Sequence, residues 1–157
     1  MIIKNSASTS LVETLDRFKN ISRKSIKVLS HHGIRLNFQG YEDFIDELSM
    51  VDDTSIESIL EVLRKVSLWK NYFDELIDVI SMIRSGLENK ELYLEAFRDN
   101  SRENKKLEEK IADNVQELEV VYNYEVFLKM LSKTLDKARK EIINDQKESL
   151  KIIGRQA

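Results

Sequence analysis

Residues 54–109 read TSIESILEVLRKVSLWKNYFDELIDVISMIRSGLENKELYLEAFRDNSRENKKLEE. Apolar residues recur in this stretch at steps of three and four, and no proline interrupts them. This spacing places the apolar side chains on one face of an α-helix. A helix of about 50 residues is roughly 75 Å long, which exceeds the diameter of a compact domain of this size. We therefore predict one long helix, or two nearly continuous ones, covered along its length by other segments of this chain or by other copies of it.

Three features of this stretch predict where its helical character changes. Thr54 and Glu57 form a capping box, in which a hydroxyl and a carboxylate each bind a backbone amide, so we expect the helix to begin there. Gly86 costs about 1 kcal/mol relative to alanine inside a helix, and it predicts a kink, a close helix contact or a break. Residues 98–106 are polar all round, which is typical of a helix end, a loop or a surface for an anionic partner.

A second long helix is predicted in the C-terminal third of the chain. Asp113 or Asn114 is suited to cap its N-terminus, and Gly154 to end it. A nearly strict alternation of steps of four and three residues joins Leu118, Val121, Glu125, Leu128, Leu131, Leu135, Ala138, Ile142 and Asp145. This spacing is the signature of a coiled-coil seam. We therefore expect this helix to return along the central one as an antiparallel hairpin.

A helix is also predicted near the N-terminus. Ser10 and Glu13 form another capping box, from which apolar spacing continues to about His31, and Gly33 supplies a stop just past the helix. His31 and His32 are adjacent on this helix and point about 100° apart, because a turn holds 3.6 residues. They make a poor chelate, so we expect no metal site.

The segment between this helix and the central stretch predicts a connector and one short helix. Residues 34–38 alternate apolar and polar side chains up to Gly40, but a lone strand has no partner for its backbone, so an extended connector is expected. Helical spacing returns in a short acidic segment with Tyr41, Phe44, Ile45 and Leu48. Residues 50–53 are expected to form the next break.

The predicted fold is therefore all-α: a coiled-coil-like hairpin of two long helices with a short N-terminal helical pair. Residues 1–53 form the N-terminal segment and residues 54–157 the hairpin, within a single domain. The N-terminal pair packs on the hairpin or is swapped onto a neighbouring copy. Two long helices carry more apolar surface than one hairpin buries, so we expect a homo-oligomer. The candidate interface residues are Leu63, Trp69, Phe73, Ile80, Leu128, Leu131, Leu135 and Ile142.

Composition narrows the class of protein. The 157 residues contain no proline and only four glycines, and 34% of them are charged, which is typical of a nearly all-helical chain. No cysteine is present, which excludes disulfides and thiolate metal sites. No segment has the apolar length of a signal peptide or a membrane span, so we expect a soluble cytoplasmic protein. The sequence contains no glycine-rich phosphate loop and no nucleophile or zinc motif. We expect a non-enzymatic protein without cofactor, metal or small-molecule substrate.

Charge is distributed unevenly along the chain, although the net charge is only −3. Residues 17–35 contain six bases and no acid, residues 42–61 contain eight acids and no base, and residues 129–155 contain eight bases and four acids. One interpretation is that the basic first helix simply packs near the acidic segment, within this subunit or the next. The other is that one or both basic segments bind a phosphate backbone. The isoelectric point of about 5.6 argues against a general nucleic-acid coat but leaves room for a local patch.

The second half of the chain resembles a known family. The segments that carry the resemblance are Leu68-Trp69-Lys70-Asn71-Tyr72, Glu91-Leu92-Tyr93-Leu94-Glu95-Ala96-Phe97-Arg98-Asp99, Ile111-Ala112-Asp113-Asn114 and Leu135-Asp136-Lys137-Ala138-Arg139. They are similar to the phage recombination mediators of the UvsY family, from Leu68 to the C-terminus. The resemblance implies a ring-like homo-oligomer that binds single-stranded DNA and contacts a recombinase and a single-strand-binding protein. It also implies that the oligomer helps to load the recombinase in place of the single-strand-binding protein. Arg98 falls where the family has a basic residue for DNA contact, whereas Glu95 stands where another base is expected.

Two hypotheses follow for the function. In the first, the protein is an oligomeric recombination mediator that binds single-stranded DNA; its candidate residues are Arg17, Arg23, Lys24, Lys27, Arg98, Arg102, Lys105 and Lys106. In the second, it is a coiled-coil adaptor or scaffold for protein–protein assembly that binds no nucleic acid. The first predicts binding that weakens steeply with salt.

Overall fold

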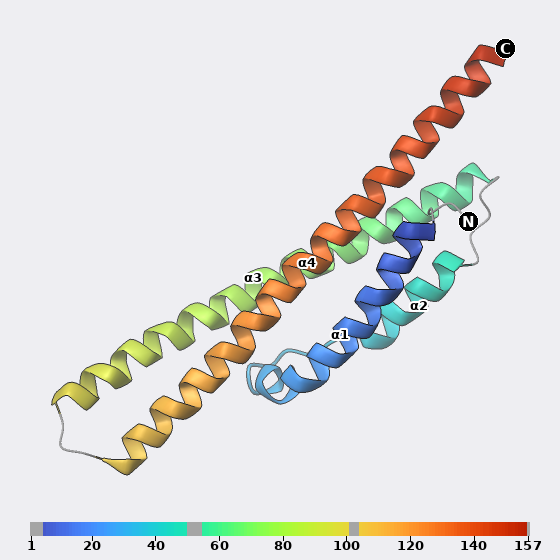
Figure 1. Cartoon of the computed structure of the whole chain (residues 1–157). Helices are drawn as coiled ribbons and strands as arrows, with labels where there is room; N and C mark the ends of the chain where they lie inside the picture. Colours follow the sequence, from blue (N-terminus) through green and yellow to red (C-terminus); the bar gives the residue numbers. More distant parts are fainter. Residues whose placement is uncertain (1–4, 50–54, 101–103, 157) are drawn as a thin grey trace.

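The computed structural model of the protein describes residues 5–49, 55–100 and 104–156. This part of the chain contains four helices, α1 (Asn5–His31), α2 (Phe38–Ser49), α3 (Ile56–Asn100) and α4 (Lys105–Gln156), and no strand. Figure 1 shows α3 and α4 side by side as a long antiparallel hairpin, with α1 and α2 against one side of it. The predicted all-α fold and the hairpin of two long helices are thus confirmed. The N-terminal pair packs on the hairpin of its own chain.

The first helix ends as predicted but begins earlier. Ser10 lies inside α1, which starts at Asn5, so the cap predicted at Ser10 is wrong. After His31 the chain turns through Gly33, whose φ of 75° lies in the left-handed region. The amide of Gly33 donates to the carbonyl of Ser30 at 3.0 Å, and this bond closes the last turn of the helix.

The connector is shorter than the alternating pattern predicted. Residues 34–37 link the helices, and α2 begins at Phe38, so Gly40 lies in its first turn and does not end the connector. The amide of Gly40 donates to the side-chain oxygen of Asn37 at 2.9 Å, which makes Asn37 the cap of α2. The short helix itself is confirmed. The break predicted at residues 50–53, like the capping residue Thr54, lies outside the described residues.

The central helix starts at a serine cap and continues through Gly86. The hydroxyl of Ser55 accepts a hydrogen bond from the amide of Ser58 at 3.3 Å. Gly86 lies inside the 45 residues of α3, and no other heavy atom lies within 4 Å of the place where its Cβ would stand. The break and the close helix contact predicted at Gly86 are therefore wrong. The intrinsic cost of one glycine is small compared with the packing that holds a long helix together.

The last helix begins and ends elsewhere than predicted. Asn104 caps α4, because its side-chain oxygen accepts a hydrogen bond from the amide of Lys106 at 3.0 Å. The caps predicted at Asp113 or Asn114 are wrong, since both residues lie within α4. The end predicted at Gly154 is also wrong, because α4 continues to Gln156. Several residues here are suited to cap a helix, and local sequence does not decide between them.

The apolar seam predicted in the C-terminal helix is buried against α3. Of its nine positions, Leu118 and Asp145 are partly exposed and the other seven are buried. On α3 the buried side chains include a series at seven-residue steps, Val66, Phe73, Ile80, Leu87 and Leu94. Facing rows of this kind bury the inner side of both helices.

The eight residues predicted to contact another copy lie in the core of a single chain. Phe73, Ile80, Leu128, Leu131 and Leu135 are fully buried, Ile142 nearly so, and Leu63 and Trp69 are partly buried against the same core. A second copy cannot reach the fully buried side chains while the chain stays folded. This surface of the hairpin is covered because side chains of α1, of the connector at residues 34–37 and of α2 pack in the same core.

An aromatic junction attaches the N-terminal pair to the hairpin. The ring of Phe18 on α1 lies 5.6 Å from that of Tyr41 on α2, 5.5 Å from Phe73 on α3 and 6.5 Å from Phe127 on α4. Two of these pairs are edge-to-face, an arrangement that the charge distribution of aromatic rings favours. All four helices therefore meet at one side chain.

Two pairs of buried hydroxyls add directional contacts around this junction. The hydroxyl of Thr14 lies 3.1 Å from that of Tyr41, and the hydroxyl of Ser22 lies 3.0 Å from that of Tyr124. Burial raises the pKa of Tyr41 to about 12, although the hydrogen bond with Thr14 acts against it. The phenol thus stays protonated at neutral pH and can share hydrogen bonds with a hydroxyl.

We expect opposite effects from alanine at two glycines. Gly86→Ala should raise the free energy of unfolding by about 1 kcal/mol, because alanine is the better helix former and its methyl group meets empty space. Gly33→Ala should lower it by about 1 kcal/mol, because the left-handed backbone there disfavours a Cβ. Urea unfolding followed by circular dichroism measures both. A destabilised Gly86→Ala variant would contradict the open surroundings of Gly86.

Candidate nucleic-acid interface

A row of bases occupies the outer face of α1. The inner face is buried through Phe18, Ser22, Ser25 and Leu29. Because these positions recur at steps of three and four, the bases between them point away from the core. Arg17, Arg23, Lys24 and Lys27 are all exposed. They extend over about 15 Å of the helix, at 1.5 Å per residue.

These four bases are available to a ligand. None of them forms an ion pair with any described residue. Lys19 of the same helix is paired instead, since it lies 3.1 Å from Glu42 of α2. His32 lies 3.9 Å from Glu117 of α4. The acidic helix thus packs on α1, as one interpretation of the charge pattern predicted. It neutralises Lys19 and leaves the outer row free.

The groove between α1 and α4 limits where an anion can lie. Lys24, Lys27 and His31 line one wall of this groove. Asp113 and Glu117 line the other wall. Their carboxylates repel an anion in the groove itself, so the favourable position for a phosphate chain is the outer ridge of α1.

The other predicted bases lie at the tip of the hairpin. Arg98, Lys105 and Lys106 are exposed there, and Arg98 approaches Glu108 at 3.7 Å, while Arg102 lies outside the described residues. Residues 88–113 contain eight acids and six bases, so the tip is not a basic surface. Figure 1 shows the tip at the far end of the hairpin, away from α1. The structure therefore does not bring the seven described candidate residues together.

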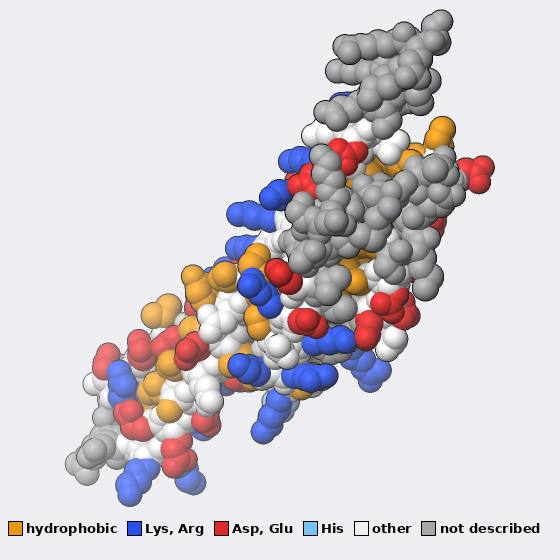
Figure 2. Space-filling model, turned by 45° about the vertical axis from the view of Figure 1, so that its right-hand side comes forward, with side chains coloured by type: hydrophobic (Ala, Val, Ile, Leu, Met, Phe, Trp, Pro, Cys, Tyr) orange, Lys and Arg blue, Asp and Glu red, His pale blue; other side chains and the backbone are white. Residues whose placement is uncertain are grey.

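A second basic surface, which was not among the candidates, follows the exposed side of α4. Lys129, Lys133, Lys137 and Lys140 are exposed at steps of four and three residues. A shallow depression beside them is lined by Lys70, Ser132, Lys133, Asp136, Lys137, Arg139 and Lys140. Figure 2 shows Lys and Arg side chains along the upper left edge of the molecule, along the lower edge of its middle and at its lower left end. The excess of bases in residues 129–155, together with the lysine spacing, was the signal that pointed to this surface.

Several bases of this second surface already have acidic partners. Asp136 lies 2.9 Å from Lys140 and 2.8 Å from Arg139, and Lys129 lies 3.4 Å from Glu125. Lys133 and Lys137 have no ion-pair partner among the described residues. This surface is therefore less free for an anionic strand than the outer row of α1.

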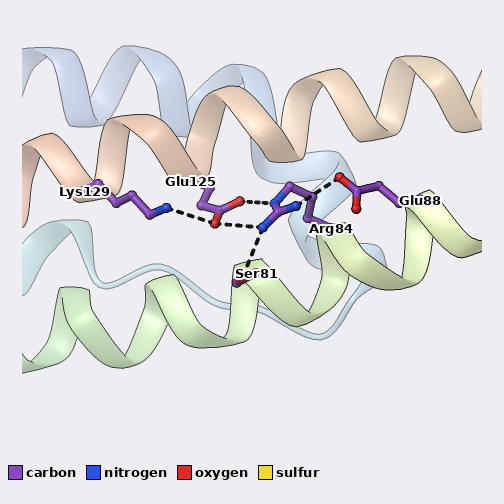
Figure 3. Close-up of polar contacts among 5 residues, drawn as sticks. All are labelled: Ser81, Arg84, Glu88, Glu125 and Lys129. Atoms are coloured by element: carbon purple, nitrogen blue, oxygen red, sulfur yellow. Dashed lines mark hydrogen bonds and ion pairs between the residues drawn. The ribbon is translucent and has the colours of Figure 1, made fainter.

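A polar network crosses the hairpin beneath this surface. Figure 3 shows Arg84 of α3 directed at Glu125 of α4, with Ser81, Glu88 and Lys129 around the pair. Arg84 also contacts Glu88 at 3.0 Å. The spacing placed Glu125 in the apolar seam, and no sequence signal paired it with Arg84, because the partners are 41 positions apart.

Glu125 remains charged despite its burial. Only 3% of the residue is exposed, and burial alone would raise the pKa of its carboxyl group. The hydrogen bonds and positive charge of Arg84, with a further contribution from Lys129, outweigh burial and lower the pKa of Glu125 below its usual 4.5. The pair thus joins α3 to α4 as ions.

Two kinds of feature are absent from the described residues. They contain no cluster of three or more His, Asp or Glu side chains arranged to hold a metal ion. Among the described helices, none combines the length and apolar character needed to cross a bilayer. Comparison with known proteins finds no family model, curated protein or solved structure that matches this chain.

We expect the Arg84–Glu125 pair to make the free energy of unfolding depend on pH in the acidic range. Glu125→Gln should lower the free energy of unfolding by about 2 kcal/mol at neutral pH, because it removes a charged partner from buried hydrogen bonds. A carboxyl group with a lowered pKa stabilises the fold fully above its unfolded pKa, near 4.5, and loses this contribution as the pH falls through the folded pKa. The difference between wild type and variant should therefore shrink below about pH 4.5 in urea titrations.

Glu109→Gln is the matched control for this experiment. Glu109 is an exposed acid of the same helix and has no ion-pair partner among the described residues. Its replacement should leave the free energy of unfolding nearly unchanged at neutral pH. An equal loss of stability in the two variants would show that burial and pairing of Glu125 do not matter.

Proposed function

We propose that this protein is a non-enzymatic, homo-oligomeric helical protein that binds single-stranded DNA along the outer face of α1. The observation that carries the proposal is the row of four exposed bases, Arg17, Arg23, Lys24 and Lys27, none of which pairs with an acid among the described residues. Free bases in a row on one helix face suit a phosphate chain, because each neutralised phosphate releases condensed counterions.

Acidic surfaces elsewhere on the chain disfavour two other paths for the strand. The net charge is −3, and both the far wall of the groove and the hairpin tip are rich in carboxylates. A strand is thus attracted to α1 and repelled from the groove and from the tip. Local attraction within an acidic protein favours one defined binding path over general coating.

The similarity of the second half of the chain to UvsY-like mediators supports a role in DNA recombination. In that role the oligomer would hold single-stranded DNA, contact a recombinase and a single-strand-binding protein, and help the recombinase to replace the latter. The strand contacts differ from the family pattern, since Arg98 belongs to the acidic tip and the free bases lie on α1. This mediator would hold DNA with its N-terminal segment and keep the hairpin for assembly.

We expect Arg23→Gln with Lys24→Gln to weaken binding of fluorescein-labelled oligothymidine, measured by fluorescence anisotropy over a series of salt concentrations. With four phosphates neutralised, the logarithm of the affinity should fall against the logarithm of salt with a slope of about 3, and loss of two bases should reduce that slope by about 1.4. The control is Lys105→Gln with Lys106→Gln, which removes two exposed bases from the tip and should leave both affinity and slope unchanged.

Two outcomes would refute the proposal. One is the absence of any anisotropy change at low salt for the wild-type protein. The other is an equal loss of affinity in the tip control, which would show that only the total charge matters.

A coiled-coil adaptor or scaffold without nucleic-acid binding is the second candidate function. It is favoured by large apolar side chains that the fold leaves on the surface, including Met82, Leu92 and Tyr93, which are 75%, 66% and 63% exposed. Exposed apolar surface of this kind is typical of protein-interaction sites. An oligomer in light scattering, combined with no affinity for DNA, would identify this function in place of the first.

A further inference from the structure

An apolar stripe runs along the open side of α4. It consists of Val115, Tyr122, Val126 and Met130, which are 42%, 54%, 51% and 36% exposed. Steps of seven and four residues place these side chains on one face of the helix. The stripe is exposed although α1 and α3 both pack on α4, because they cover other sides of this helix.

The side of α4 that meets α1 is distinct from this stripe. Tyr124 and Phe127 are buried there, and they reach Ser22 and Phe18 of α1 respectively. Tyr122 and Val126 point elsewhere, since neighbouring helix positions diverge by about 100°. From Tyr122 to Met130 the open side therefore presents an apolar row of about two turns, without a partner in the described part of the chain.

Two unpaired charges of opposite sign flank the centre of the stripe. Glu119 and Lys133 lie seven residues before and after Val126. Seven residues are nearly two turns, so both charges lie on the same face as Val126, each about 10 Å along the helix from it. Both side chains are exposed, and neither has an ion-pair partner among the described residues.

We propose that the occupant of this stripe is α4 of a second copy of the chain, packed antiparallel about a two-fold axis through Val126. In this arrangement Tyr122 of each copy packs on Met130 of the other, and Glu119 of each copy faces Lys133 of the other. Every contact away from the axis occurs twice, as in any isologous interface. The proposal rests on the homo-oligomer of the proposed function, but it requires no nucleic acid.

Charge decides between the antiparallel and parallel arrangements. The two-fold axis places residues 129–147 of one copy along residues 105–123 of the other. The first range contains six bases and three acids, whereas the second contains five acids and three bases. A parallel pair would instead place Glu119 beside Glu119 and Lys133 beside Lys133, and like charges in contact disfavour association. The unlike halves of α4 thus select the antiparallel partner.

The absence of cysteine from the chain provides a direct test of the axis. Val126→Cys should form a covalent dimer under mild oxidation, because two cysteines on the axis approach within the distance that a disulfide spans. Met82→Cys, on α3 and 75% exposed, is the control and should remain largely monomeric on denaturing gels under the same conditions. Equal or faster crosslinking of the control would overturn the proposal.

A charge exchange tests the orientation in free solution. Glu119→Lys and Lys133→Glu should each raise the dissociation constant of the dimer about tenfold, since each replaces two ion pairs by two like-charge contacts. The double variant Glu119→Lys with Lys133→Glu should restore the wild-type constant, because the same pairs form with reversed sign. Sedimentation equilibrium without DNA measures all three. Circular dichroism confirms that these surface variants stay helical.

Failure of this inference can be told from failure of the proposed function. The two-fold contact would be refuted if the wild-type protein stays monomeric in the ultracentrifuge, or if the double variant dimerises no more tightly than the single variants. Neither result bears on DNA binding, which the anisotropy assay tests separately. Conversely, a crosslinked Val126→Cys dimer without affinity for oligothymidine would support the contact and refute DNA binding. The bases of α1 take no part in the dimer, so Arg23→Gln with Lys24→Gln should not change its dissociation constant.

Discussion

The packing of Phe18 against one aromatic ring from each of the other three helices is the contact on which the arrangement depends. Two helices as long as α3 and α4 bury only their facing sides on each other, and the remaining sides must meet another segment or water. At the aromatic junction, α1 and α2 cover one side of the hairpin. Edge-to-face ring pairs contribute about 0.5–1.5 kcal/mol beyond their buried area. The buried hydroxyl pair of Thr14 and Tyr41 then joins α1 to α2, and that of Ser22 and Tyr124 joins α1 to the hairpin.

Polar contacts inside the hairpin select the register of its helices. Apolar rows at seven-residue steps can slide past each other by a whole repeat with little loss of contact. Such a shift would leave the buried carboxylate of Glu125 without Arg84, which is far more costly than a change of apolar neighbours. Asn114 adds a second constraint, since its side-chain amide donates to the backbone carbonyl of Leu87 at 3.0 Å. These contacts make one register more favourable than its neighbours, and they hold the open side of α4 in a defined position.

The proposed DNA-binding surface on α1 and the proposed dimer surface on α4 lie on different sides of the fold. The bases of α1 point outward from the covered side of the hairpin, whereas Tyr122 and Val126 lie on a side of α4 that α1 leaves open. A two-fold dimer through the open side would leave both basic rows at its outer surfaces. Two linked binding rows raise the effective concentration of the second contact once the first has formed. Self-association and strand binding would thus reinforce each other without sharing residues.

The sequence by itself determined the helical class, the end of α1 at His31 and the inner face of α4, because these follow from side-chain periodicity and from the conformational freedom of Gly33. It also named bases of α1 as candidates, because residues 17–35 contain six bases and no acid. Only the structure shows that four of them have no ion-pair partner among the described residues. The sequence did not determine where α4 begins, since several residues near its start are suited to cap a helix and the choice depends on the whole hairpin. Nor did it show that one chain covers its own seam, or that Glu125 pairs with Arg84. Periodicity reveals which side of a helix is buried, but only the tertiary structure decides what buries it and which side remains open.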